Sequence, residues 1–170
     1  MTPLLGELAD ALPPDVQLHG EVLALDQSGR PDFHRLSSRM LHKCGGIDVT
    51  LFVFDVLAVA GLPTTMLPYA DRRVLLEEIL VESQRVRLVA TFEDGEALLA
   101  AVCARGLEGV VAKRVRDPYR PGDRGWIKTK NRTTARFAEE RSRGLRQSSQ
   151  AVTSPQRKAT LHLSRRAASN

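Results

Sequence analysis

The stretch Val49-Thr-Leu-Phe-Val-Phe-Asp-Val-Leu-Ala-Val-Ala60 is an almost unbroken apolar run near the middle of the chain. Its valines and phenylalanines favour a β-strand, and only Thr50 and Asp55 interrupt the apolar pattern. A run of this kind is typical of a central strand that is buried on both faces. We therefore predict that residues 49–60 form the middle of a sheet and supply the best part of the core.

Helical periodicity and strand alternation succeed one another on both sides of this run. Gly106 is placed to end the last of the predicted helices in the left-handed conformation. The pattern indicates an α+β domain with mixed or antiparallel sheets flanked by helices. Helices are predicted at residues 2–12, 33–40, 68–80 and 93–105, and further strands at 16–25, 85–91, 108–113 and 125–130.

The charge of the chain is unevenly distributed. The 170 residues have a formal net charge of +5, but residues 131–170 carry +7 and the rest of the chain carries −2. Such a segment favours polyanionic partners and would bind duplex DNA weakly, with a steep salt dependence. A merely solubilising tail explains it equally well. Because Ser, Gln, Arg and Ala dominate from residue 143 onward, we predict a folded domain over 1–137 and a basic, disordered tail over 138–170.

The cysteine and histidine content excludes several classes of protein. Two cysteines, Cys44 and Cys103, make no disulfide framework, which fits a reducing cytosol. His34, His42 and Cys44 lie close together but lack a second ligand pair at zinc-finger spacing, so we interpret them as solvated loop residues. No apolar run approaches the roughly 20 residues that a membrane span needs. We therefore predict a cytoplasmic, nucleoid-associated protein without a membrane partner.

A pair of lysines in the stretch Trp126-Ile-Lys-Thr-Lys130 indicates an anion site. Strand alternation puts Lys128 and Lys130 on one face, about 7 Å apart, and Ile127 and Thr129 on the other. Two like charges at that distance favour a bound phosphate, and Trp126 on the same face can shield it from water. The alternative is a solvated edge strand that carries lysines against aggregation.

Two carboxylates and one aromatic ring could complete such a site. Glu21 and Glu108 lie in or next to apolar strands, where a carboxylate needs a cation, a hydroxyl or a helix end as partner. A magnesium ion that bridges Glu108 to the phosphate would be the partner of one of these carboxylates. Phe54 shares strand parity with Phe52 and Val56, so its ring could stack on a purine if that face lines a pocket. Otherwise Phe54 belongs to the core.

Four stretches in this order resemble the adenylation domain of ATP-dependent DNA ligases, a branch of the nucleotidyltransferase superfamily. They are Leu18-His-Gly-Glu21, Phe52-Val-Phe-Asp55, Glu108-Gly-Val-Val-Ala-Lys113 and Trp126-Ile-Lys-Thr-Lys130. The resemblance covers residues 14–132 and implies an ATP-grasp-like fold, ATP with its AMP moiety and Mg²⁺ as cofactors, and nicked double-stranded DNA as substrate.

The resemblance also implies a role for individual residues. Glu21 would contact the ribose of AMP, Phe54 would stack on adenine, and Glu108 would help to bind the metal. Lys128 and Lys130 would hold the α-phosphate, and Lys113 would assist them in binding the nucleotide. His19 stands where the family usually has Asp, which is a departure from the family's pattern.

The family's nucleophile is not found among the five lysines of this chain. Ligases of this family attack ATP with the lysine of a Lys-x-Asp-Gly motif and form a lysine–AMP phosphoramidate. The other two lysines here are Lys43 and Lys158, and none of the five begins that motif. We therefore expect a domain that lacks the family's N-terminal part and does not adenylate itself. The chain could be a gene fragment, the product of a misassigned start, or one half of a split enzyme whose other half, a separate polypeptide, supplies the motif. The missing part would leave sheet edges and apolar surface uncovered.

Two further hypotheses compete with a ligase fragment. The chain could be a non-catalytic nucleic-acid or nucleotide-binding protein that keeps the lysine pair and the basic tail. It could also serve RNA ligation or capping in the same superfamily. The segments between the motifs, such as residues 26–40 and 67–80, resemble bacterial DNA ligases and argue against this last hypothesis.

Overall fold

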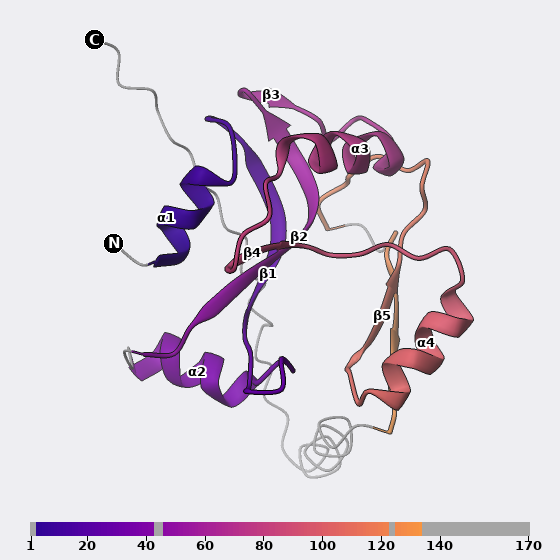
Figure 1. The fold of residues 1–170 in the computed structure, drawn as a ribbon. Coiled ribbons are helices and arrows are strands. Elements are labelled where there is room, and N and C mark those ends of the chain that lie inside the picture. Colours follow the sequence, from indigo (N-terminus) through magenta and orange to yellow (C-terminus); the bar gives the residue numbers. More distant parts are fainter. Residues whose placement is uncertain (1–2, 43–45, 123–124, 134–170) are drawn as a thin grey trace, which may run out of the picture. The chain divides into compact units, whose positions relative to one another are not determined.

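The computed structural model describes residues 3–42, 46–122 and 125–133, which form two compact units (Figure 1). The first unit contains residues 3–90 and 114–122, and the second contains residues 91–113 and 125–133. The helices are α1 (Pro3–Asp10), α2 (Phe33–His42), α3 (Tyr69–Ile79) and α4 (Gly95–Ala104), and the strands are β1 (Gln17–Ala24), β2 (Val49–Val59), β3 (Leu62–Pro63), β4 (Val86–Leu88), β5 (Gly109–Ala112) and β6 (Ile127–Lys130).

The first unit is built around β2, as predicted. This strand pairs with β1 and β3 in antiparallel fashion and with β4 in parallel fashion, which gives a four-stranded mixed sheet. Leu8 of α1 and Leu76 of α3 are buried in one cluster with Val53 of β2 and Val86 of β4. Together with the strands of the second unit, this arrangement confirms the predicted α+β class.

The prediction that β2 is buried on both faces was wrong. Burial alternates along the first seven residues, so that Leu51 and Val53 are buried whereas Phe52 and Phe54 are only partly covered. Leu51 and Val53 face the core that α1 and α3 also supply. The apolar run is therefore continuous because aromatic rings occupy the half-buried face, not because a second core covers it.

Several other elements are shorter than their patterns predicted. The strand expected at 85–91 is limited to Val86–Leu88, and the helix expected at 93–105 begins at Gly95. Asp94 causes that later start, because its carboxylate accepts hydrogen bonds from the backbone N–H groups of Glu96 and Ala97 and so caps the helix. Gly106 follows α4 with φ of +66°, which confirms the predicted left-handed end.

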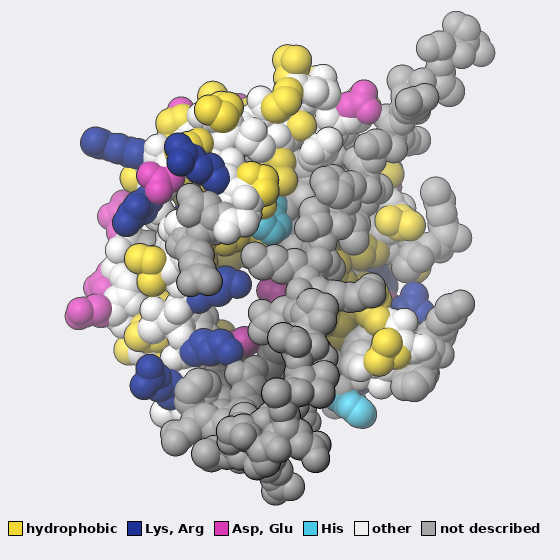
Figure 2. All heavy atoms as spheres, turned by 180° about the vertical axis from the view of Figure 1, so that it is seen from behind, with side chains coloured by type: hydrophobic (Ala, Val, Ile, Leu, Met, Phe, Trp, Pro, Cys, Tyr) yellow, Lys and Arg dark blue, Asp and Glu magenta, His cyan; other side chains and the backbone are white. Residues whose placement is uncertain are grey.

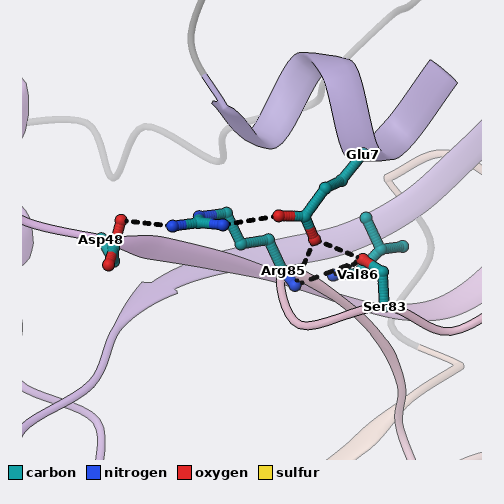
Figure 3. A network of polar contacts seen from close by, with 5 residues as sticks. All are labelled: Glu7, Asp48, Ser83, Arg85 and Val86. Carbon is teal, nitrogen blue, oxygen red and sulfur yellow. Dashed lines mark hydrogen bonds and ion pairs between the residues drawn. The ribbon is translucent and has the colours of Figure 1, made fainter. Parts of the chain in front are cut away.

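A polar network joins α1 to the residues just before β4 (Figure 3). One oxygen of Glu7 accepts hydrogen bonds from the Ser83 hydroxyl (2.6 Å) and the Arg85 backbone N–H (2.8 Å). The Arg85 guanidinium donates to the other Glu7 oxygen (2.5 Å) and to Asp48 (2.8 Å). The Ser83 hydrogen bond, and then that of Arg85, lower the pKa of Glu7 below its ordinary value of 4.5.

The second unit consists of α4 and the antiparallel pair of β5 and β6. Among its described residues only Val102 and Asn131 are buried. Asn131 holds the turn before β5, because its side-chain amide donates to the Leu107 carbonyl (2.9 Å) and its backbone N–H donates to the Glu108 carbonyl (2.7 Å). This small sheet is therefore organised by local hydrogen bonds and not by a core.

Large apolar side chains reach the surface in several places (yellow in Figure 2). On α2 these are Phe33, Met40 and Leu41, each more than 60% exposed. Within the described part of the chain, no helix combines the length and the hydropathy that crossing a membrane requires. The predicted boundary at residue 137 and the predicted basic tail lie outside the described residues, as does Cys44.

Candidate functional site

In the first unit, the pairing of β1 with β2 contains an irregularity at Phe54. His19 lies opposite Asp55 and Gly20 lies opposite Val53, so the register skips Phe54. An extra residue of this kind forms a β-bulge, which locally turns the strand and re-aims its side chain. The bulge also breaks the predicted parity, because Val56 is fully buried whereas Phe54 is not.

Gly20 allows β1 and β2 to come this close. A Cβ atom at this position would lie 2.7 Å from the Phe52 carbonyl oxygen, well inside contact distance. Glycine is therefore required between His19 and Glu21 for a backbone reason, in addition to any contact with a ligand. Glu21 lies directly opposite Phe52 and is exposed. Because cross-strand partners share a face, Glu21 stands on the half-buried face of the sheet.

His19, Phe54 and Tyr119 form a cluster of rings in the first unit. The ring centroids of His19 and Phe54 are 4.7 Å apart at an interplanar angle of 55°, and the His19 ring meets Tyr119 edge-on at 5.5 Å. Burial raises the pKa of the Tyr119 hydroxyl, the charge of Asp55 raises it further, and that of Arg72 lowers it. The residue that departs from the family's usual Asp thus packs on the predicted adenine platform.

An ion pair that the sequence analysis missed lies next to this cluster. Asp55 and Arg72 have side chains that are 0% and 1% exposed, and the guanidinium binds both carboxylate oxygens at 2.8 and 2.9 Å. A signal for it was present in the sequence. Asp55 interrupts an apolar strand, where a buried carboxylate requires a cationic or hydrogen-bonding partner.

In the second unit, the register of β5 and β6 places the lysines. Lys128 lies opposite Val111 and Lys130 lies opposite Gly109. These two lysines therefore stand on one face, and both are exposed. The Lys113 ammonium lies 4.1 Å from the centroid of the Trp126 ring, in cation–π geometry. Continuing the register beyond Ala112 puts this pair on the same face, so the unit gathers three lysines and one indole.

Gly109 makes this register possible. Its φ is +156°, and a Cβ atom built on it would collide with the Thr129 carbonyl oxygen. Only glycine lets the two backbones approach so closely between Glu108 and the strand. The glycine of the predicted Glu108-Gly-Val-Val-Ala-Lys113 motif is thus explained by backbone contact.

Glu108 is an exposed carboxylate immediately before β5. The described residues contain no group of three His, Cys, Asp or Glu side chains that could form a metal cage. Magnesium is commonly held by one or two carboxylates together with waters and substrate phosphates. The donor set here, a carboxylate in the unit that carries the lysines, is compatible with that mode of binding.

Each unit thus brings together one part of the predicted set. The first unit carries Glu21 and Phe54 on the half-buried face of its sheet, and the second carries Glu108, Lys113 and the lysine pair. The assignment of ligand contacts to these residues remains a prediction.

The interpretation of His34 and His42 as loop residues was wrong, because both lie in α2. The zinc hypothesis is not tested, because Cys44 lies outside the described residues.

Comparison with known proteins gives consistent matches. The family model for the ATP dependent DNA ligase domain matches residues 2–130. A "Probable DNA ligase" of Nocardioides sp. is 38% identical over 133 residues, which cover 75% of this chain and 26% of that protein. The "Multifunctional non-homologous end joining protein LigD" of Pseudomonas aeruginosa is 36% identical over 117 residues, 66% of this chain and 14% of that protein.

The solved structures agree with these matches. A mycobacterial DNA ligase D complexed with ATP and MES has a TM-score of 0.59 and 33% identity, over 75% of this chain and 42% of that one. The ligase domain of Mycobacterium tuberculosis LigD has a TM-score of 0.56 and 33% identity, over 68% of this chain and 37% of that one. The chain therefore spans about a quarter of the length of relatives such as the Nocardioides protein.

Proposed function

Because this chain belongs to the ATP-dependent DNA ligase family, we propose that it handles adenylate during the sealing of nicked double-stranded DNA, in repair or recombination. The match spans about a quarter of the Nocardioides relative and a smaller share of the LigD protein, so the proposal concerns this chain's share of that reaction. The observation that carries it is the face of the β5–β6 sheet where three lysines and Trp126 are gathered.

The first unit provides groups suited to a nucleoside. Phe54 presents a partly covered ring, and stacking of a base on such a ring stabilises binding by about 1–3 kcal/mol. Glu21 is exposed and can accept a hydrogen bond from a ribose hydroxyl. We assign adenine to Phe54 and ribose to Glu21.

The second unit provides groups suited to phosphate. Lys128 and Lys130 present two ammonium groups side by side, and Lys113 adds a third that rests on the Trp126 ring. These charges oppose the negative charge that builds up on the α-phosphate during AMP transfer. Glu108 is the residue that would hold magnesium, and the ion when bound supplies further positive charge to the phosphate oxygens.

The first step of ligation needs an attacking lysine that this chain does not provide in a Lys-x-Asp-Gly context. We propose that the chain alone does not form a lysine–AMP adduct and that the nucleophile comes from another segment or a separate polypeptide. Incubation with radiolabelled ATP and Mg²⁺ tests this directly. A labelled band that survives denaturation would contradict it.

Sealing of a nick whose 5′ end is already adenylated bypasses the missing step and tests the proposed function. Purified chain and Mg²⁺ are expected to join such a nick slowly. Lys128→Ala should abolish the joining, whereas Thr129→Ser, on the opposite face of the same strand, should retain it.

The outcome also separates the enzyme from a binding protein. A folded chain that binds the nick but never joins it would contradict the catalytic proposal. Binding that weakens steeply with salt would then favour the non-catalytic alternative, because contacts to phosphate release counterions.

A further inference from the structure

We propose that Arg72 of α3 is a positioning residue for adenine, and this inference rests on the proposed function. Its ion pair with Asp55 and its contact with Tyr119 hold the cluster of rings in which Phe54 lies. Arg72 itself is buried and does not touch the nucleotide in this proposal.

The Arg72 guanidinium uses donors on three nitrogens toward three different segments. Nε and Nη2 bind the two oxygens of Asp55 on β2 at 2.8 and 2.9 Å. Nη1 donates to the Leu67 carbonyl at 2.6 Å and to the Asp117 carbonyl at 3.4 Å. Lysine has one nitrogen and no planar fork, so it cannot reproduce this arrangement.

The segment that carries Tyr119 is held in the first unit by backbone hydrogen bonds and is also contacted by Arg72. Its backbone is bound to the start of α3, where the Tyr69 N–H donates to the Asp117 carbonyl at 3.0 Å. The Tyr119 N–H also donates to the Thr65 carbonyl at 2.8 Å. Arg72 lies beneath this segment, with Cζ 5.8 Å from the centroid of the Tyr119 ring.

Tyr119 contacts Phe54 indirectly, through the His19 ring. Tyr119 meets the edge of His19, and the His19 ring packs on Phe54. From the other side Asp55, the residue after Phe54, is fixed by the same guanidinium at the β-bulge. One buried cation therefore controls both the strand that carries the ring and the neighbours that orient it.

If Asp55 and Arg72 only filled the core, they would not need to be an ion pair. A buried ion pair is often replaceable by apolar residues of similar volume without loss of stability. The pair Asp55→Leu with Arg72→Met would keep the core filled but would remove the Arg72 donors from the Leu67 and Asp117 carbonyls and the guanidinium from the Tyr119 ring. Stability and adenine recognition are therefore separable in this pair.

Calorimetric titration of the full chain with ATP and with sodium tripolyphosphate, both with Mg²⁺, tests the proposal. Arg72→Lys is expected to reduce the preference for ATP over tripolyphosphate about tenfold, because only ATP carries a base that needs the oriented platform. Arg73→Lys is the matched control. Its guanidinium binds the exposed Glu77 on the same helix, and the preference should be retained.

A folded Arg72→Lys chain that keeps the wild-type preference overturns the proposal. If that variant does not fold, the Asp55→Leu/Arg72→Met chain replaces it. A folded double variant with the wild-type preference overturns the proposal, and a folded double variant with a reduced preference supports it.

If the wild-type chain does not bind ATP, the proposed function fails, and proton NMR then decides the positioning role alone. Nuclear Overhauser contacts between the His19 and Phe54 rings should be lost in Arg72→Lys, or in the double variant, and kept in Arg73→Lys. Their persistence in a folded Arg72 variant overturns the proposal.

Discussion

The two units of the chain hold their functional side chains by different means. In the first unit Phe54 stands on a strand whose other face packs into a core with Leu76 and Val86, next to a buried ion pair. In the second unit Lys128 and Lys130 stand on the exposed strand β6, where a glycine and a buried amide fix the backbone. A two-stranded sheet of that kind is marginal by itself. The groups proposed for the base are thus supported by packing, and those proposed for phosphate by backbone geometry.

The chain carries a spectroscopic probe for each unit. Its single tryptophan, Trp126, lies in the second unit, and its two tyrosines, Tyr69 and Tyr119, lie in the first. Urea denaturation followed separately by tryptophan and by tyrosine fluorescence therefore tests whether the two units are stabilised independently. If every variant shifted the tryptophan and tyrosine midpoints equally, the contrast between the units would be contradicted, because the units would then unfold as one.

The largest effect is expected from Asp55→Ala. It leaves the Arg72 guanidinium buried without its counter-ion, which typically costs about 3–5 kcal/mol of the free energy of unfolding. The tyrosine-detected midpoint should fall accordingly. Adding Arg72→Met to Asp55→Ala should recover part of the loss, since it removes the uncompensated charge. A loss below about 1 kcal/mol would mean that the pair is hydrated, contrary to its burial.

Gly109→Ala is expected to be next in size and to act on the second unit. The new methyl group collides with the Thr129 carbonyl and holds the backbone at an unfavourable φ, which costs about 1–3 kcal/mol. The tryptophan-detected transition should shift, and tripolyphosphate binding should weaken. Gly95→Ala is the control in the same unit, because no atom lies within 4 Å of its added Cβ.

Lys128→Ala is expected to change binding without changing stability. The side chain is exposed and has no share in a core, so both unfolding transitions should stay in place. Its loss should weaken tripolyphosphate binding about tenfold, the effect of one charge-assisted hydrogen bond. Thr129→Ser should leave the dissociation constant unchanged. An equal loss of tripolyphosphate affinity in Lys128→Ala and Thr129→Ser would mean that the lysine face does not bind phosphate.

The smallest effect concerns pH and the first unit. The pKa of Glu7 is lowered by Ser83 and Arg85, so its ionised form stabilises the fold above about pH 4.5, and this contribution disappears as the pH falls through the depressed value. Glu7→Gln should therefore flatten the acid limb of the tyrosine-detected stability profile below pH 4.5. The residues of the network in Figure 3 all belong to the first unit, so no matching change is expected in the signal of Trp126, which belongs to the second. A variant with the wild-type acid limb would contradict the assignment.

Local patterns predicted the parts of the fold that depend on neighbours in sequence. The central position of β2, the left-handed glycine that follows α4 and the single face shared by Lys128 and Lys130 follow from hydropathy, turn chemistry and strand alternation. The resemblance in four motifs led to the family that the comparisons support. The length of β4 was overestimated, because pairing with β2 and not its own alternation sets its ends.

Tertiary structure alone decided how the functional rings and charges are supported. The bulge at Phe54, the burial of Arg72 beneath Tyr119 and the contact of Lys113 with Trp126 each join residues from separate segments. Periodicity reports which face a side chain occupies relative to its neighbours in sequence. It does not report which distant backbone lies opposite, because that register is set by packing and hydrogen bonding of the whole sheet. The chain's own residues therefore determined its family and its lysine face, and the folded arrangement determined what orients the ring at position 54.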